Sequence, residues 1–199
     1  MNKSQKRIWN DIAPEWHQHK TRPSEFSKEF LSKQTGKVLD FGSGSGRHLQ
    51  KIEKGKMYLV DFSGEMIRLA KQKAKKQKIL ADFIVADMTQ LLFEDNFFDS
   101  AISISSLHCL NPSQHESAIK ELYRVLKPKA HALIGVWNKD STRFRRYKTQ
   151  EKYIGWTDKG KRYYYLFYED EIHNLFKRAG FKIISMHNSP LMINFIVEK

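Results

Sequence analysis

The sequence is poor in the features that mark secreted, membrane-spanning or cysteine-stabilised proteins. Its 199 residues include one cysteine, Cys109, which excludes an internal disulfide and a metal site built from several cysteines. No apolar run approaches the length that crosses a membrane, and residues 1–16 contain no apolar core of a signal peptide. We therefore expect a cytoplasmic protein that binds neither a membrane nor a metal.

Acidic residues are also scarce, since 22 Asp and Glu stand against 35 Lys and Arg and give a formal net charge of +13. Such an excess attracts polyanions, nucleic acid first among them, although a well-solvated lysine-rich surface has the same composition. The 40% content of hydrophobic residues is typical of a globular chain. No linker or repeat divides the sequence, so we expect a single domain over residues 1–199.

Short apolar runs alternate with helical patterns, which is typical of an α/β domain with a mostly parallel sheet. The runs that predict strands are 37–41, 57–61, 82–87, 98–105 and 131–137. Helical spacing of apolar residues predicts helices at 46–53, 64–77, 113–126 and 169–179. Residues 181–187 and 191–198, separated by a turn at 188–190, predict an antiparallel pair of strands.

The stretch VLDFGSGSG (38–46) places Gly42, Gly44 and Gly46 directly after an apolar strand. A strand that leads into a helix through such a turn often binds a nucleotide, because glycine lets a ligand approach the backbone. The spacing G-x-G-x-G differs from the G-x-G-x-x-G that holds a pyrophosphate at a helix N-terminus. Asp40, just before the loop, disfavours a phosphate and favours a cationic ligand.

Two further acids follow the next two strands. Asp61 comes about twenty residues after the loop, where a carboxylate accepts hydrogen bonds from ribose hydroxyls. Asp87, with Met88, lies within reach of an adenine amino group. A nucleoside with a positively charged tail and no phosphate fits this set, and S-adenosylmethionine is such a ligand. The cofactor-binding residues that we expect are Asp40, Gly42, Ser43, Gly44, Gly46, Asp61, Phe62, Asp87, Met88 and Ser105.

These motifs resemble, in order and spacing, those of the class I S-adenosylmethionine-dependent methyltransferases. The matching stretches are VLDFGSGSG, LVDFSGEM, VADM and FDSAISISSLHCL, within residues 36–137. The resemblance implies a Rossmann-like fold, with a seven-stranded, mostly parallel sheet, helices on both faces and an antiparallel C-terminal strand. It also implies that the glycines admit the methionine part of the cofactor. The alternative is a non-catalytic nucleic-acid-binding or scaffold subunit that kept the fold.

The flanking segments are similar to the tRNA wobble-uridine carboxyl methyltransferases, which convert 5-carboxymethyluridine at the wobble position to its methyl ester. The similarity lies in residues 8–14, 20–23, 101–108 and 136–137, and in RYYYLFY at 162–168 with Glu171. It implies the anticodon stem-loop of tRNA as substrate and a small zinc-binding activator protein that pairs with the third strand. Tyr165 and Cys109 depart from the family, in which histidine is common at both positions.

Methylation of a carboxylate needs no general base, because the nucleophile is already ionised at pH 7. The site must align the acceptor and exclude water, and a guanidinium with phenolic or imidazole donors suits that task. We expect the catalytic, acceptor-binding residues to be Arg22, His108, Arg162 and Tyr164. The alternatives are a surface role for Arg22 and a core role for His108.

Residues 138–168 combine cations and aromatic side chains beside the expected cofactor edge, a mixture suited to phosphate contacts and base stacking. The cations are Arg143, Arg145, Arg146, Lys148, Lys152, Lys159 and Lys161. We expect this segment to be a substrate lid and residues 1–35 to be an N-terminal cap helix and loop. The alternative function is methylation of a small acceptor, such as a quinone or a metabolite carboxylate, for which the basic segment has no evident purpose.

Overall fold

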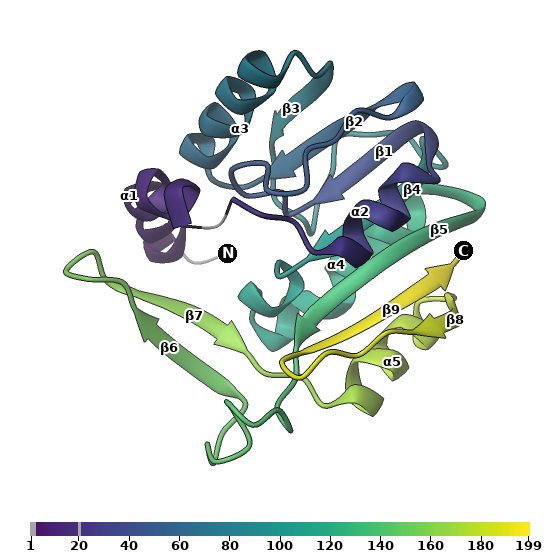
Figure 1. Cartoon of the computed structure of the whole chain (residues 1–199). Coiled ribbons are helices and arrows are strands. Elements are labelled where there is room, and N and C mark those ends of the chain that lie inside the picture. The colour runs from purple at the N-terminus through teal and green to yellow at the C-terminus, as the bar shows by residue number, and fades with distance from the viewer. Residues whose placement is uncertain (1–2, 20) are drawn as a thin grey trace.

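A computed structural model describes residues 3–19 and 21–199 and contains the predicted seven-stranded sheet, with the order β3-β2-β1-β4-β5-β9-β8 (Figure 1). The first five strands run parallel, and β9 runs antiparallel to both β5 and β8. The strands are β1 Thr35–Phe41, β2 Glu53–Asp61, β3 Ala81–Val85, β4 Phe98–Ile104, β5 Leu126–Trp137, β8 Lys182–Met186 and β9 Met192–Glu198. The helices are α1 Lys3–His19, α2 Glu25–Ser32, α3 Gly64–Gln77, α4 Pro112–Val125 and α5 Glu169–Arg178, with a short 3-10 helix at Leu107–Cys109.

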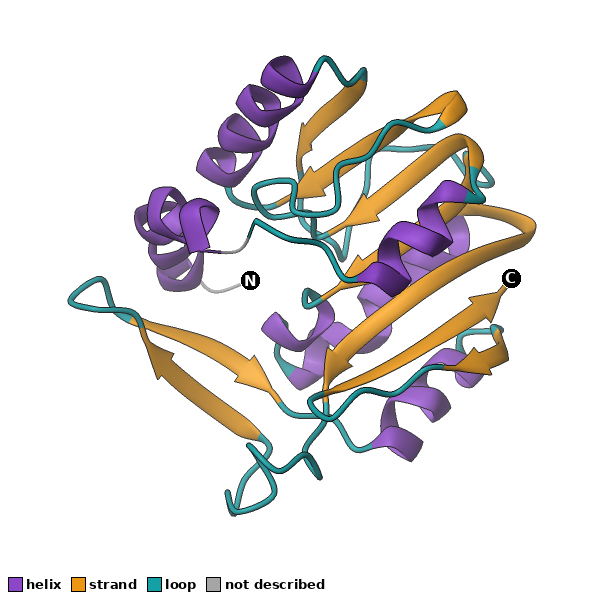
Figure 2. Ribbon diagram, viewed as in Figure 1, coloured by secondary structure: helices purple, strands orange, loops and turns teal. Residues whose placement is uncertain are grey.

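Helices cover both faces of the sheet, as predicted (Figure 2). On one face Leu31 of α2 and Ile67 of α3 are buried with Val38 of β1. On the other face Ile119 of α4 and Phe176 of α5 belong to the larger apolar cluster. Because both faces are covered, the central strands are apolar on both sides, which is why they are continuous hydrophobic runs in the sequence.

The helix predicted at 46–53 is absent, and this prediction was wrong. After Gly46 the chain continues in turns and then without regular structure until β2 begins at Glu53. Residues 47–52 are too few to offset the cost of nucleating a helix, and Gly46 itself has a left-handed φ of 76°. Leu49 and Ile52 are nevertheless buried in the core that α2 and α3 cover.

Other boundaries differ from the prediction where tertiary contacts extend an element. β5 begins at Leu126, immediately after α4, so Pro128 lies inside a strand rather than in a loop. The N-terminal segment contains a second helix, α2, where the sequence predicted only a loop. Its N-cap is Ser24, whose Oγ accepts a hydrogen bond from the backbone N–H of Ser27 at 3.1 Å.

Residues 138–168, the hairpin segment, fold as a loop followed by two antiparallel strands, β6 (Glu151–Gly155) and β7 (Lys161–Tyr165). The hairpin projects from the main sheet toward α1 (Figure 1). Gln5 of α1 accepts the N–H of Tyr163 at 2.9 Å and donates to the carbonyl of Lys161 at 3.2 Å. Within the part of the chain that the structure describes, no helix has the length and apolarity needed to cross a membrane.

Candidate active site

A cavity of about 510 Å³ opens at the carboxyl ends of β1, β2 and β4, bordered by α1, the loop before α2 and the hairpin segment. Strand order reverses between β1 and β4, and open α/β sheets bind ligands at such a switch point. The volume lies in the range of about 300–1,000 Å³ that is usual for small-molecule sites. This geometry makes the cavity the candidate active site.

Most of the residues predicted from the sequence line this cavity. They are Arg22, Gly42, Ser43, Gly44, Asp61, Phe62, Met88, Ser105, His108 and Tyr164. The predicted residues that do not line it are Asp40, Gly46, Asp87 and Arg162. Asp87 instead accepts hydrogen bonds from the N–H and the hydroxyl of Thr89, at 2.9 and 2.8 Å.

The glycine loop packs closely against the rest of the protein at Gly42 and Gly46 and leaves open space at Gly44. A Cβ at Gly42 would lie 2.3 Å from Cβ of Ser106, and a Cβ at Gly46 would lie 3.2 Å from Cβ of Ala70 on α3. A Cβ at Gly44 would meet no protein atom within 4 Å, although Gly44 lines the cavity. Its bare backbone therefore leaves room for a ligand at this point of the loop.

Asp61 is fixed by two backbone donors, one in the glycine loop and one in the turn after β2. Its carboxylate accepts the N–H of Gly44 at 2.8 Å and that of Ser63 at 2.9 Å. Burial raises the pKa of Asp61 to about 6, against the lowering effect of these two N–H groups. Asn10 of α1 accepts the Ser63 hydroxyl at 2.7 Å, so α1 supports the turn that holds the acid. A carboxylate held in this way can accept further hydrogen bonds from ribose hydroxyls.

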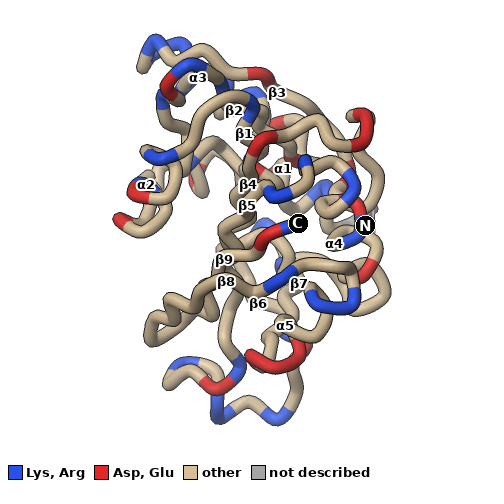
Figure 3. Tube along the Cα trace, turned by 90° about the vertical axis from the view of Figure 1, so that its right-hand side faces the viewer, with Lys and Arg blue, Asp and Glu red and all other residues tan. Residues whose placement is uncertain are grey.

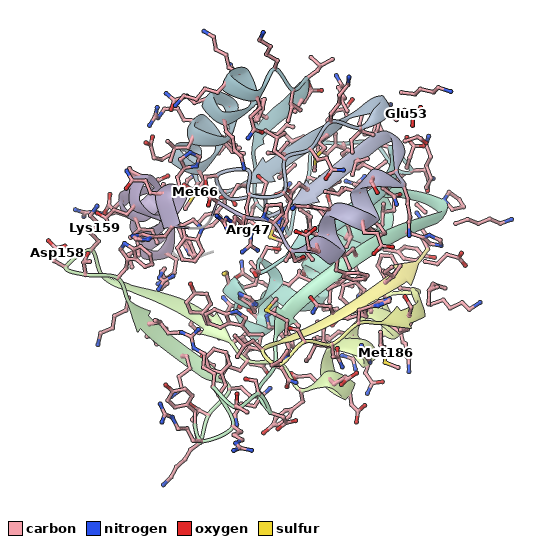
Figure 4. All side chains as sticks on the ribbon, in the orientation of Figure 1. Arg47, Glu53, Met66, Asp158, Lys159 and Met186 are labelled. Atoms are coloured by element: carbon pink, nitrogen blue, oxygen red, sulfur yellow. The ribbon has the colours of Figure 1, made fainter. Side chains whose placement is uncertain are left out.

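Asp40 is buried beneath the loop, and neither of its oxygens has a hydrogen-bond partner among the described residues. Burial raises the pKa of Asp40 to about 7, and the charge of Arg47 opposes the rise. Arg47 lines the cavity, and sequence reasoning missed it. The sequence signal that could have identified it is a basic residue directly after Gly46, the third glycine, together with the acidic Asp40 before Gly42. Arg47 and Met66, both labelled in Figure 4, approach the cavity from the glycine loop and from α3.

Lys73 of α3 is a second residue that the sequence analysis missed. Its ammonium donates to the carbonyl of Gly46 at 2.6 Å and lies 3.5 Å from that of Arg47. If a helix followed the glycine loop, the carbonyls of Gly46 and Arg47 would accept hydrogen bonds from backbone N–H groups further along that helix. Lys73 therefore replaces part of the hydrogen bonding that the absent helix would provide.

His108 is buried beside an aromatic wall formed by Trp137 and Tyr164. Its Nδ1 accepts the backbone N–H of Trp137 at 3.0 Å, so in the neutral ring Nε2 carries the proton. Burial lowers the pKa of His108 to about 3, which keeps the ring neutral at physiological pH. The Trp137 ring centroid lies 4.8 Å from His108 and 4.4 Å from Tyr164. The imidazole can therefore donate a hydrogen bond through Nε2.

Arg162 lies behind this wall and does not reach the cavity. Its Nη1 donates to the hydroxyl of Tyr164 at 2.6 Å, and its guanidinium lies 4.9–5.7 Å from the ring centroids of Trp9, Trp16, Trp156 and Tyr164. In this geometry Arg162 positions the hydroxyl of Tyr164, and its predicted contact with the acceptor stays a prediction.

The cations that line the cavity toward its opening are Arg22 and Arg143, and both side chains belong to exposed residues. The guanidinium of Arg143 lies 5.5 Å from the ring centroid of Trp137 and 5.1 Å from that of Phe144. Figure 3 shows Lys and Arg along the hairpin segment and also on α3. In residues 3–19 and 21–199, no group of three or more His, Cys, Asp or Glu side chains is arranged to hold a metal.

The strand order, the glycine loop at the switch point and the acids at the ends of β1 and β2 are those of the Rossmann-like fold of class I S-adenosylmethionine-dependent methyltransferases, which this chain resembles. A family model described as "Methyltransferase domain" matches residues 38–129. S-adenosylmethionine is the cofactor, and the open space at Gly44, the acid Asp61 and the cavity volume fit it.

The chain also resembles particular methyltransferases. It is 35% identical over 136 residues to tRNA (carboxymethyluridine(34)-5-O)-methyltransferase of Arabidopsis thaliana, which covers 66% of this chain and 32% of that protein. It is 31% identical over 137 residues to 2-phytyl-1,4-naphtoquinone methyltransferase of Nostoc punctiforme, which covers 65% of this chain and 53% of that protein. The chain thus spans about a third and about a half of the length of these two relatives.

A solved structure resembles the whole described fold. It is a chain from the complex between the Haloferax volcanii Trm112 methyltransferase activator and a methyltransferase. The TM-score is 0.75 at 15% sequence identity, over 98% of this chain and 95% of that one. At this identity the likeness shows the fold alone.

Cofactor affinity is expected to fall as pH drops through about 7 and then about 6, where Asp40 and Asp61 take up protons. S-adenosylmethionine brings a sulfonium and an ammonium, and ionised acids favour these positive charges. Asp40→Asn should remove the step near pH 7 and leave the step near pH 6. Calorimetric titration with S-adenosylmethionine between about pH 5 and pH 8 measures both steps.

In the ligand-free protein the same acid acts on folding with the opposite sign. The folded-state pKa of Asp40 is raised above the ordinary 3.8, so its stabilising contribution is present below about pH 4 and is lost as pH rises through about 7. At about pH 8, Asp40→Asn should therefore raise the free energy of unfolding by about 1–3 kcal/mol. Asp158→Asn, at an exposed position of the hairpin, is the control. Equal effects of Asp40→Asn at low and high pH would contradict the assignment.

Proposed function

We propose that this protein methylates the carboxylate of 5-carboxymethyluridine at the wobble position of tRNA. The observation that carries the proposal is that, among the described residues, the acceptor end of the cavity offers hydrogen-bond donors and its buried titratable groups are not free to act as a general base. His108 presents a protonated Nε2, and Arg22 and Arg143 are cations. A site of this kind suits an acceptor that is already an anion.

The buried titratable groups that line the cavity are unsuited to removing a proton near neutral pH. His187, an exposed residue that also lines the cavity, has its Nε2 2.9 Å from the hydroxyl of Ser185. Burial raises the pKa of Tyr164 and Cys109 and lowers that of His48 and His108 to about 3. The carboxylate of Asp61 is occupied by the N–H groups of the glycine loop and of the turn after β2. An acceptor that must lose a proton, such as a phenol or a carbon acid, would find no evident base among these groups.

The chain's own residues have four tasks in this mechanism. Asp61 and the glycine loop bind the cofactor, Arg22 and Arg143 hold the acceptor carboxylate, and His108 donates through Nε2 to orient it. Trp137 and Tyr164 exclude water, which strengthens these charged interactions. When bound, S-adenosylmethionine supplies an electrophilic methyl group that an ionised carboxylate attacks without transfer of a proton.

The name of the Arabidopsis relative, which specifies carboxymethyluridine 34 of tRNA, supports this substrate. The test is incubation of the protein with labelled S-adenosylmethionine and total tRNA, followed by identification of the labelled nucleoside by mass spectrometry. The methyl ester of 5-carboxymethyluridine is the expected product. Transfer of the labelled methyl group to a carbon of a base or ribose, or no transfer to tRNA, would contradict the proposal.

A small-molecule acceptor is the second candidate, and the similarity to a naphthoquinone methyltransferase favours it. The same labelled cofactor, offered with quinols and small carboxylic acids in place of tRNA, separates the two candidates. Methyl transfer to a quinol would require a base and would therefore also contradict the mechanism above.

Binding of tRNA is expected to weaken steeply with salt, and Arg145→Ala with Arg146→Ala should make the dependence shallower. Both arginines are exposed on the hairpin segment, and each lost phosphate contact lowers the slope by about 1. Fluorescence anisotropy of a labelled anticodon stem-loop over a range of salt concentrations measures the slope.

The matched control removes two positive charges from exposed positions of α3, outside the hairpin segment, by Lys71→Ala with Lys75→Ala. Both lysines are exposed, and neither lines a cavity. If the arginine and lysine pairs change the slope equally, the hairpin segment is only a solvated basic surface.

We further propose that a small activator protein adds a strand beside β3. β3 is an edge of the sheet, as the sequence predicted, and Ile84 and Phe83 pack on opposite faces. The apolar side chains left exposed at this edge are Leu80 at 76%, Val85 at 50% and Leu92 at 86%. An unpaired edge strand with exposed apolar groups can pair with a strand of another protein. The chain of similar fold in the Haloferax volcanii structure was solved as part of a complex with an activator.

Co-expression with such an activator is expected to raise both the solubility and the activity of the protein. Val85→Glu, at the β3 edge, should abolish the gain because it places a charge in the apolar contact. Ile184→Glu on β8, the opposite edge strand, is the control, since Ile184 is 42% exposed. A monodisperse and fully active monomer that gains nothing from the activator would refute this proposal.

A further inference from the structure

A second cavity, of about 420 Å³, adjoins the cofactor cavity and has no role in the chemistry described above. It shares Pro23, Ser45 and Arg47 with the first cavity. It is enclosed by the end of α1, the start of α2, the segment that follows the glycine loop and the C-terminal half of α3. The described residues that line it are His17, Thr21, Pro23, Lys28, Ser45, Arg47, Leu49, Gln50, Lys73 and Gln77.

The lining is cationic, and none of its residues is an acid. Lys28, Arg47 and Lys73 carry positive charges, and His17 can add another. Burial lowers the pKa of His17, and the nearby charges of Lys73 and Lys76 lower it further. The charge of Lys73 thus reaches His17, and that of Arg47 reaches Lys73, where buried Asp40 opposes it. An anion bound among these cations would relieve the remaining repulsion.

Several hydrogen-bond donors in this cavity remain available. Lys73 has three N–H groups and uses them toward at most two carbonyls. The guanidinium of Arg47 makes one contact at the long limit of a hydrogen bond, 3.5 Å to the hydroxyl of Ser105. Lys28 pairs with Glu25 at 2.7 Å, but both side chains are largely exposed and such pairs are weak.

We propose that this cavity binds a phosphate group of the RNA chain next to the acceptor nucleotide, a proposal that rests on the function proposed above. A nucleotide in the cofactor cavity has its neighbouring phosphates a short distance away, and the shared wall at Arg47 places this cavity beside it. Among the described residues of the lining none is Phe, Tyr or Trp, so the cavity suits a sugar and phosphate rather than a stacked base. Its volume exceeds that of one phosphate and leaves space for the attached ribose.

The experiment introduces negative charge into the cavity with little change of shape, by Gln50→Glu with Gln77→Glu. The dissociation constant of a labelled anticodon stem-loop RNA should rise at least about 10-fold, and the salt slope should become shallower by about 1. Calorimetry should find S-adenosylmethionine affinity within a few-fold of the parent protein. The matched control is Gln72→Glu, the same chemical change on an exposed position of α3 outside the cavity.

Different outcomes separate this proposal from the proposed function. If tRNA is methylated but the double variant binds RNA as Gln72→Glu does, the phosphate site is wrong. If no tRNA is methylated while the double variant still weakens RNA binding selectively, the site stands and the proposed function fails. Tight binding of ribose 5-phosphate that the double variant removes, with RNA affinity unchanged, would overturn the RNA assignment in favour of a small phosphorylated ligand.

Discussion

Replacing His108 with asparagine is expected to lower the rate of methyl transfer about 10²–10³-fold, the usual effect of removing one well-placed donor from an active site. Asparagine keeps an oxygen near the position of Nδ1, so the N–H of Trp137 retains an acceptor. It cannot present a donor where Nε2 lies. The affinity for S-adenosylmethionine should stay within a few-fold, which calorimetry checks alongside single-turnover kinetics.

His108→Gln separates donation from general-base catalysis. Glutamine can supply an N–H near the position of Nε2 but cannot accept a proton, so it should restore part of the activity if His108 is a donor. The pH–rate profile of the parent protein should likewise lack a limb from His108 near its ordinary pKa, because burial lowers that pKa to about 3. A glutamine variant as inactive as the asparagine variant, together with a limb near pH 6–7 at saturating cofactor that disappears in both His108 variants, would contradict the donor role.

Arg162→Ala is expected to lower the free energy of unfolding by about 3–5 kcal/mol, a loss typical of breaking a buried charged interaction. The guanidinium is packed among Trp9, Trp16 and Trp156, each contact of this kind contributing about 0.5–2 kcal/mol. Its removal also leaves the buried hydroxyl of Tyr164 without its donor. Urea unfolding, monitored by tryptophan fluorescence, measures the change.

Two comparisons identify the origin of this loss. Arg162→Met fills much of the same volume without the charge, so its stability should lie between those of alanine and arginine. Arg145→Ala, at an exposed position of the same segment, should change stability by less than about 0.5 kcal/mol. An Arg162→Ala variant within about 1 kcal/mol of the parent would show that the aromatic cluster does not depend on the guanidinium.

The sequence predicted the sheet well because its signals are local. Each parallel strand contains an apolar run, buried in every case except the edge strand β3, and α3 and α4 show helical spacing of apolar residues over more than three turns. The error at 46–53 arose because a glycine loop followed by a few apolar residues reads as the start of a helix. The length of the connection between β1 and β2 is fixed by the pairing of the two strands, in which Thr35 lies opposite Glu53. This pairing is not visible in the sequence.

The candidate site was predictable where a residue follows a strand and less so where it arrives through tertiary contacts. Gly44, Asp61 and Ser105 lie at strand ends and line the cavity. Lys73 lies in the middle of a helix, in a run of lysines that reads as a solvated surface, and no sequence signal separates it from its neighbours. Arg162 was predicted as an acceptor ligand, a prediction that stays untested, and its burial behind Tyr164 depends on how β7 packs against α1.

One helix, α1, contacts both the cofactor site and the hairpin. Asn10 supports the turn that holds Asp61, and Gln5 binds the backbone of β7. Glu15 pairs with Lys159, which is labelled at the tip of the hairpin in Figure 4. Any ligand that orders α1 from one side lowers the entropic cost of ordering it from the other. Cofactor and the proposed RNA substrate should therefore be energetically linked through this helix, and linkage requires that the factor by which each tightens the other is the same.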